Sequence, residues 1–276
     1  MKTTFLLLFL SISILGKSQV LKEINVEIAG SLSTSLTESE KSTVTDLTVT
    51  GTINALDIKC MRDQITYLTN IDLNDANIAA FDGIALSSVS YSYPANEMPR
   101  LSFYNGTAGK AKTTLVSIIL PNSLTSIGEY AFRLCENIKS IYIGNSITNI
   151  GREAFEGCSG LTTVTMGPSV TTIQRDAFHY CYALKNITFS ENITYIGEDA
   201  FTHSAVDKVV FPNSMTTVNN SFRQCDYLKE VTLPASVTNI TNWAFQYCYG
   251  LNTIFSLNTT PPVCEAYSFY LVPNVT

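Results

Sequence analysis

A phrase of 22 or 23 residues recurs six times within residues 115–250, and this repetition restricts the fold more than any other feature of the sequence. The copies begin at Leu115, Ile138, Leu161, Leu184, Val206 and Leu228, and Leu251 opens a seventh. A fixed period in this range is typical of a solenoid, in which each copy forms one turn. One copy alone cannot bury its apolar side chains, whereas stacked copies can. The sequence therefore predicts a solenoid with six regular turns.

The residue types within a copy predict how each turn is built. Positions 1, 4 and 6 of the first copy are Leu115, Ile118 and Leu120, which we expect to point inward from an extended segment. Pro121 ends that segment, because proline lacks a backbone donor. A second inward apolar residue follows at position 13, and an Ala-Phe pair then closes the turn. Position 13 holds Ile127, Ile150, Ile173, Ile196, Val218 and Ile240.

Two segments precede the repeats and differ from them in composition. Residues 1–18 have the order of a secretory signal peptide, with the basic Lys2, an apolar run and a small-residue end. Export to the cell surface or the medium is therefore expected. Residues 19–43 are expected to form an N-terminal cap, in which Thr37 and Glu40 have capping-box spacing for a short helix.

Residues 44–114 are interpreted as divergent early repeats with an irregular aromatic insertion, and residues 54–65 have room for one short helix. Leu68 and Leu115 are 47 residues apart, close to twice the period, so we expect a further turn hidden between them. The aromatic residues of the insertion are Tyr91, Tyr93, Phe103 and Tyr104. They either pack over the edge of the solenoid or carry an individual function, and packing is favoured. Residues 251–276 are interpreted as a degenerate last repeat that is cut short.

Composition excludes some classes of partner. The chain has 276 residues, 45% hydrophobic and 14% charged, so it can bury a long core. The formal net charge of −6 and the absence of a basic stripe argue against a nucleic-acid partner. Beyond the signal peptide no apolar stretch of membrane length appears, so the mature chain is expected to be soluble and without a transmembrane segment.

The repeat resembles the BspA-type leucine-rich repeats of secreted and surface-exposed proteins of anaerobic bacteria and some protists. The resemblance is carried by L-P-A-S-V-T-N-I in residues 228–248 and by L-P-N-S-L-T-S-I-G-E-Y-A-F-R-L-C in residues 115–135. Residues 47–51 and 71–78 resemble the lead-in of that family. The resemblance implies a right-handed curved coil with a parallel sheet on one face and short strands, turns or short helices on the other. It also implies binding rather than catalysis.

One cysteine column and one threonine column run along the repeats. Cys135, Cys158, Cys181, Cys225 and Cys248 share one position, where Ser204 replaces cysteine in the remaining copy. Side chains stacked about 4.8 Å apart point in parallel, whereas a disulfide needs its Cβ atoms turned toward each other, so free, buried thiols are expected. Thr125, Thr148, Thr171, Thr194, Thr216 and Thr238 share another position, and we expect their hydroxyls to bond locally. No metal site or cofactor is expected, since C-x-x-C pairs are missing and the sequence has only two histidines.

An acidic column gives the best enzyme hypothesis. Glu153, Asp176 and Asp199 occupy the same position in successive copies, where stacked carboxylates could hold Ca²⁺ or act on a polysaccharide as an acid and base pair. The structural interpretation is favoured: each acid precedes an Ala-Phe pair, where a carboxylate suits the start of a short helical segment, and arginines lie beside two of them. We therefore expect no catalytic residue.

The outward positions of the long strand remain as a binding surface. The candidate residues on this concave face are Tyr142, Thr165, Thr188, Lys208, Val210, Glu230, Thr232 and Phe255. They form either an ordinary solvated sheet face or a shallow groove for an extracellular protein or glycan, with Tyr142 and Phe255 as anchors. The sequence thus favours a non-catalytic binding or adhesion module for host or neighbouring-cell macromolecules. The alternatives are a structural envelope protein and, less favoured, the polysaccharide-acting enzyme.

Overall fold

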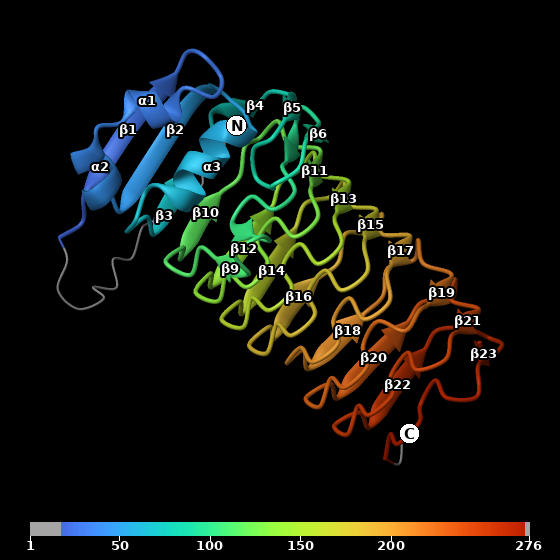
Figure 1. The fold of residues 1–276 in the computed structure, drawn as a ribbon. Coiled ribbons are helices and arrows are strands. Elements are labelled where there is room, and N and C mark those ends of the chain that lie inside the picture. Colours follow the sequence, from blue (N-terminus) through green and yellow to red (C-terminus); the bar gives the residue numbers. More distant parts are fainter. Residues whose placement is uncertain (1–17, 274–276) are drawn as a thin grey trace, which may run out of the picture.

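Each repeat copy forms one turn of a β-solenoid, as predicted, in a computed structural model that describes residues 18–273 (Figure 1). The predicted signal peptide therefore lies almost wholly outside the described residues. The first row of parallel strands consists of β1 (Leu21–Val26), β2 (Asp46–Ile53), β3 (Asn70–Asp72), β10 (Ser117–Ile119), β12 (Ser140–Ile143), β14 (Thr163–Met166), β16 (Asn186–Thr188), β18 (Lys208–Val210), β20 (Glu230–Leu233) and β22 (Thr253–Ser256). This row carries the predicted binding positions.

A second row of short parallel strands runs beside the first (Figure 1). It consists of β7 (Glu97–Met98), β11 (Ser126–Ile127), β13 (Asn149–Ile150), β15 (Thr172–Ile173), β17 (Tyr195–Ile196), β19 (Thr217–Val218), β21 (Asn239–Ile240) and β23 (Val263–Cys264). The apolar residues at position 13 lie in this row and are buried, which confirms their predicted inward direction. A side of tight turns, which we call the loop face, closes each coil and buries the Ala-Phe pair.

The phenylalanines of the loop face form a continuous ladder through the core. Their rings stack from turn to turn with centroids 5.1 to 6.1 Å apart. The ladder contains Phe103, Phe132, Phe155, Phe178, Phe201, Phe222, Phe245 and Phe269. Phe269 lies beyond the point where the sequence motif degenerates, so the fold of the turn persists there without the motif. A large buried ring at one position of every turn fixes the stacking of the coil.

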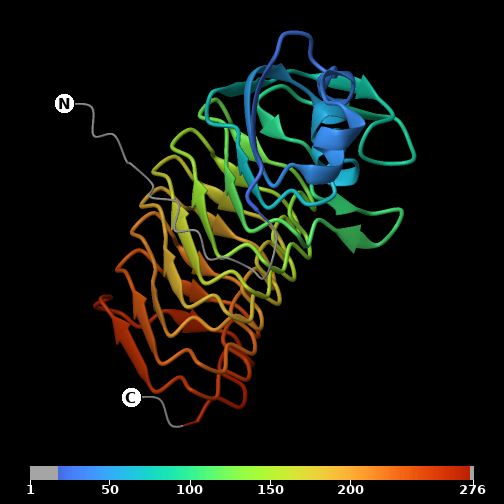
Figure 2. The same ribbon diagram turned by 90° about the vertical axis from the view of Figure 1, so that its left-hand side faces the viewer.

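Three helices cover the N-terminal end of the stack, as the view in Figure 2 shows from the side. They are α1 (Leu32–Ser35), α2 (Glu38–Thr43) and α3 (Ala55–Asp63). The predicted capping box is present, since the Thr37 hydroxyl accepts from the Glu40 amide and the Glu40 carboxylate accepts from the Thr37 amide. The helix expected within residues 54–65 is α3, whose first turn is capped by Asn54. Strand β1, which the sequence did not predict, pairs with β2 and extends the first row.

The aromatic insertion belongs to a single long turn. β3 pairs directly with β10, so the prediction of a further hidden turn between Leu68 and Leu115 is wrong. The extra residues form two antiparallel hairpins, β5 (Phe81–Gly83) with β6 (Tyr91–Tyr93) and β8 (Tyr104–Asn105) with β9 (Lys110–Ala111), while β4 (Ala76–Ile78) pairs with the end of β2. Tyr93 and Phe103 are buried, and Tyr91 and Tyr104 pack against the core. The favoured prediction, that these aromatic residues pack onto the solenoid, is confirmed.

Candidate functional site

The outward side chains of the first row form one surface, which we call the long-strand face. Strand register aligns the predicted residues into two sets of neighbours on adjacent strands. The first set is Tyr142, Thr165 and Thr188, and the second is Val210, Thr232 and Phe255. Lys208 lies beside Glu230 in register, and their side chains form an ion pair. Tyr142, Val210 and Phe255 are each about half exposed, at 52%, 53% and 51%. The structure thus brings the predicted residues onto one face.

The long-strand face is interrupted between β16 and β18. β16 pairs with β14 and β18 pairs with β20, but in the described structure no ladder joins β16 to β18, as none joins β10 to β12. In neighbouring turns a regular bond runs from position 2 of one turn to position 2 of the turn before, for example from the Lys185 amide to the Thr162 carbonyl at 3.2 Å and from the Lys229 amide to the Asp207 carbonyl at 2.8 Å. Within residues 18–273 the equivalent bond is missing from Asp207 to Lys185, and also from Lys139 to Val116. The interruption was not among the features predicted from the sequence.

The second row is interrupted at the same junction. β17 pairs with β15 and β19 pairs with β21, but β17 and β19 are not joined. The expected threonine ladder shows the same gap. After Thr125, each threonine amide donates to the threonine carbonyl of the turn before at 2.8 or 2.9 Å, except at the step from Thr216 to Thr194, where the described structure has no such bond. The Asn219 side chain instead donates to the Ile196 carbonyl at 3.0 Å.

The loop face alone stays continuous across this junction. The amides of Phe201 and His203 donate to the carbonyls of Ser221 and Arg223 at 2.9 and 3.3 Å. The rings of Phe201 and Phe222 stack with centroids 5.1 Å apart. The two parts of the regular solenoid, residues 115–205 and 206–273, are therefore joined by main-chain bonds along one side only, while side-chain bonds from Ser214 to the Ile193 carbonyl and from Asn219 to the Ile196 carbonyl also cross the junction. We call them the first block and the second block.

Bulky residues and shortened turns explain the interruption. Position 6 holds Leu120, Ile143 and Met166 in the preceding copies and Leu233 in a later one, but Phe189 and Phe211 at the junction. The Phe189 and Phe211 rings lie 6.1 Å apart, and both pack edge-on against Phe222 of the ladder. Two residues separate Cys181 from Leu184, whereas only Ala205 separates Ser204 from Val206, so the corner before β18 is one residue shorter. Larger side chains and a shorter corner together displace β18 from β16.

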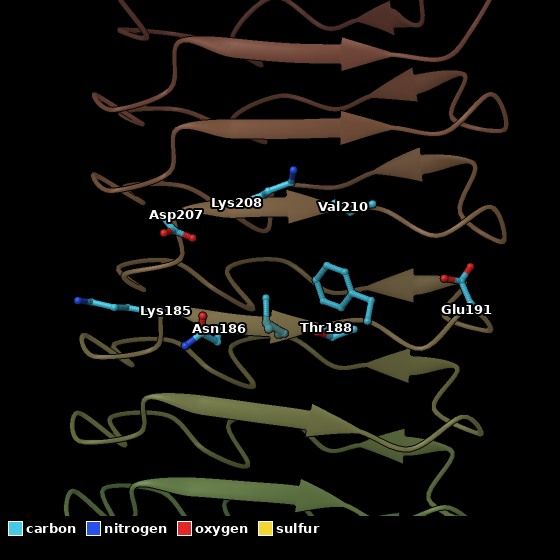
Figure 3. Close-up of a pocket in the computed structure, with 9 residues that line it drawn as sticks. Lys185, Asn186, Thr188, Glu191, Asp207, Lys208 and Val210 are labelled. Atoms are coloured by element: carbon cyan, nitrogen blue, oxygen red, sulfur yellow. The ribbon is translucent and has the colours of Figure 1, made fainter.

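The gap forms a cleft of about 380 Å³ in the long-strand face (Figure 3). It is lined by Lys185, Asn186, Ile187, Thr188, Phe189, Glu191, Asp207, Lys208 and Val210. Thr188, Lys208 and Val210 were candidate residues, whereas Tyr142 and Phe255 lie on other strands of the same face. The change from Leu or Met to Phe at position 6 was the sequence signal that could have located the cleft.

The acidic column lies on the loop face, in backbone that differs from the prediction. Glu153, Asp176 and Asp199 have φ of 53°, 57° and 52°, which is the left-handed region. No helix begins at these residues in the described structure, so the prediction that each acid starts a short helical segment is wrong. A non-glycine residue costs free energy in this conformation, and it occurs here because each turn must reverse sharply before the Ala-Phe pair.

Each carboxylate of the column has a partner. The partners are Arg133 and Arg152 for Glu153, Arg175 and His179 for Asp176, and the Thr202 hydroxyl for Asp199, at 2.7 to 3.4 Å. Burial opposes ionisation of Asp176, but the hydrogen bond from His179 and the charge of Arg175 outweigh it and hold the pKa of this carboxyl below its usual range. The column is therefore a set of ion pairs and hydrogen bonds along the loop face.

A second acid close to this column is held in its protonated form to unusually high pH. Burial, and next the hydrogen bond to Glu153, raise the pKa of Glu156 to about 8, although Arg133 lies 3.1 Å away and opposes the shift. Arg133 thus serves two carboxyl groups. Within residues 18–273 no group of three or more His, Cys, Asp or Glu side chains is placed to hold a metal ion.

The cysteine column is free and buried, as predicted, but its chemistry is more specific than the sequence analysis suggested. The thiol of each cysteine donates to the backbone carbonyl of a ladder phenylalanine in the turn before. Cys158 reaches the Phe132 carbonyl at 3.1 Å, and Cys248 reaches the Phe222 carbonyl at 3.0 Å. The cysteine thus contributes a buried hydrogen bond between turns as well as a small apolar side chain, and serine at position 204 matches it in size.

A family model and several solved structures match this chain. The family model for BspA type leucine rich repeat regions matches in six copies over residues 110–221 and 206–276. Among solved structures, a leucine-rich repeat protein of T. pallidum is 27% identical over 51% of this chain and 67% of its own, with a TM-score of 0.47. A leucine rich cell surface protein of Faecalibacterium prausnitzii is 20% identical over 77% and 65%, with a TM-score of 0.41. The pneumococcal antigen PcpA is 15% identical over 85% and 62%, with a TM-score of 0.40.

No curated protein matches this chain. In residues 18–273, every helix is too short or too polar to cross a membrane. The family model covers more than half of the chain, and the strand rows, the phenylalanine ladder and the repeat period agree with it. The chain belongs to the BspA-type leucine-rich repeat family.

Proposed function

We propose that this protein is an exported, non-catalytic binding module that holds an extracellular protein or glycan on its long-strand face. Export is inferred from the order of residue types in residues 1–18. Binding is inferred from the family and from the surface itself. Because a solenoid exposes a long row of strands on one side, it suits an extended macromolecular ligand better than a small molecule.

The observation that carries this proposal is the exposure of large apolar side chains at outward positions of the first row. Tyr142, Val210 and Phe255 are about half exposed among small polar neighbours, and none of them contributes to the core. The fold does not require an aromatic residue at these positions, since the same position holds threonine in other turns. Aromatic residues on an otherwise polar surface are the groups that most often dominate binding energy.

The test is binding of the purified protein to an immobilised panel of matrix proteins and glycans, with circular dichroism to show that the sample is folded. We expect saturable binding to one class of ligand. Tyr142→Ser or Phe255→Ser should weaken it by about tenfold or more while the fold persists. The matched control is Tyr195→Ser, because Tyr195 is comparably exposed, at 42%, but lies in the second row. Equal affinity of all three variants would reject this surface.

A further inference from the structure

We propose that the cleft between β16 and β18 binds an extended peptide segment with an acidic side chain at the Lys185 end and a basic side chain at the Glu191 end. This inference rests on the proposed function, because it names the class of segment that the long-strand face receives and the place where it lies.

The first argument is the pairing of the strands that border the cleft. β16 is the last strand of the sheet formed with β12 and β14, and β18 is the first strand of the sheet formed with β20 and β22. Each therefore presents an edge toward the other with no ladder between them. Such an edge is a template for a further strand, since a peptide in extended conformation matches its alternating donors and acceptors. A glycan lacks this regular row of amides, so the edges favour a peptide.

The second argument is the floor of the cleft. Ile187 is only partly buried here, whereas Ile141 and Val164, its equivalents in earlier turns, are buried. Ile187, Phe189 and Val210 are the apolar residues that line the cleft. Alternate side chains of an extended peptide point to one face, so every second residue of the segment would meet this floor.

The third argument is the distribution of charge along the cleft. Lys185, Asp207 and Lys208 lie where the two strands begin, and Glu191 lies at the opposite end (Figure 3). The two lysines outnumber the single aspartate at the first end, and Glu191 is the charged residue that lines the second. In the described structure Lys208 is paired with Glu230, while Lys185 forms no ion pair. Lys185 is therefore the cation best placed to receive a carboxylate of the ligand.

The fold also allows the cleft to adjust its width. The two blocks are joined at this junction through the loop face, where main-chain bonds and the stacked rings of Phe201 and Phe222 persist. Small rotations about that side change the separation of β16 and β18 without breaking a ladder in either block. A strand that pairs with both edges needs about twice the 4.8 Å spacing of neighbouring strands, and this side provides the hinge.

The experiment is a selection from a displayed library of linear ten-residue peptides on the immobilised purified protein. Enriched peptides are then synthesised and titrated against the wild type, Lys185→Glu and Lys139→Glu. Lys139 is the matched control, because it occupies the same repeat position, is also exposed, and precedes β12, which pairs with the strand of the following turn, β14. We expect Lys185→Glu to weaken binding about tenfold and Lys139→Glu to change it less than about twofold.

Two further measurements identify the binding mode. Methylation of alternate peptide nitrogens should abolish binding, because it removes main-chain donors and keeps the side chains. Bound peptide should slow hydrogen exchange at residues 186–190 and 207–211 and leave residues 140–143 unchanged. If no peptide is enriched, or if enriched peptides bind Lys185→Glu as tightly as the wild type, the inference is wrong. Retained binding to the macromolecular panel would then leave the proposed function standing, whereas loss of both would remove it as well.

Discussion

The junction between the fourth and fifth regular turns differs from the junction between the second and third in two of its three sides. At the earlier junction β12 pairs with β14 and β13 pairs with β15, and the rings of Phe155 and Phe178 stack 5.2 Å apart. At the later junction both strand ladders are missing, and the ring contact remains at 5.1 Å. The same repeat thus tolerates loss of both sheets as long as the loop face holds.

This comparison shows which contacts hold neighbouring turns of the coil together. At this junction the loss of both strand ladders accompanies one residue fewer in the corner and two larger side chains at position 6. The ladder of buried rings depends on one residue per turn and survives the change. In a solenoid each turn contacts only its neighbours, so stability is a sum of turn and interface terms, and a weakened interface divides the array.

The largest expected effect comes from removing a ladder ring on each side of this comparison. Phe201→Ala and Phe178→Ala should each lower the free energy of unfolding by about 3–5 kcal/mol, because a fully buried ring leaves a cavity. Only Phe201→Ala should also uncouple the two blocks, since Phe201 stacks on Phe222 across the interrupted junction.

The chain offers a natural probe for this uncoupling. Trp243 is its single tryptophan and lies in the second block, so tryptophan fluorescence follows that block while circular dichroism follows the whole chain. The two signals should coincide in denaturant titrations of Phe178→Ala and separate in those of Phe201→Ala. Coincident signals in both variants would show that the junction couples the blocks as strongly as any other.

Much of this architecture was predictable, because every copy of the repeat carries similar residue types at the same positions. The period, the inward residues such as Ile127, the buried cysteines and the capping box at Thr37 all follow from residue type and spacing. The interruption was not predicted, because it arises from the summed effect of Phe189, Phe211 and a short corner on two strands. The hidden turn was predicted wrongly, because length alone cannot distinguish two turns from one turn with hairpins.

The pH dependence of stability should also differ between the blocks. Glu156 and Gln246 occupy the same repeat position, and only the first can ionise. Because burial raises the pKa of Glu156 to about 8, its contribution to stability is fully present below its ordinary pKa of 4.5 and is lost as the pH rises through about 8. As the pH rises from 5 to 8.5, the free energy of unfolding of Glu156→Gln should therefore increase relative to that of the wild type. Denaturant titrations at several pH values measure this difference. The exposed Glu136→Gln is the control, and an equal change in both variants would contradict the assignment.

The smallest expected effect concerns the one turn whose thiol is absent. Ser204 lies at the interrupted junction, and its hydroxyl lies 3.4 Å from the Cys225 sulfur, whereas the cysteines of the other turns donate to a phenylalanine carbonyl in the turn before. Cysteine has the longer side chain, so Ser204→Cys should add the missing bond to the Phe178 carbonyl and stabilise the first block by up to about 1 kcal/mol. Cys158→Ala should cost about 1–2 kcal/mol, because it removes the donor to the Phe132 carbonyl and leaves a small void. If Ser204→Cys instead destabilises the chain, the narrower hydroxyl is required by the packing at the junction, and the interruption then extends into the loop face.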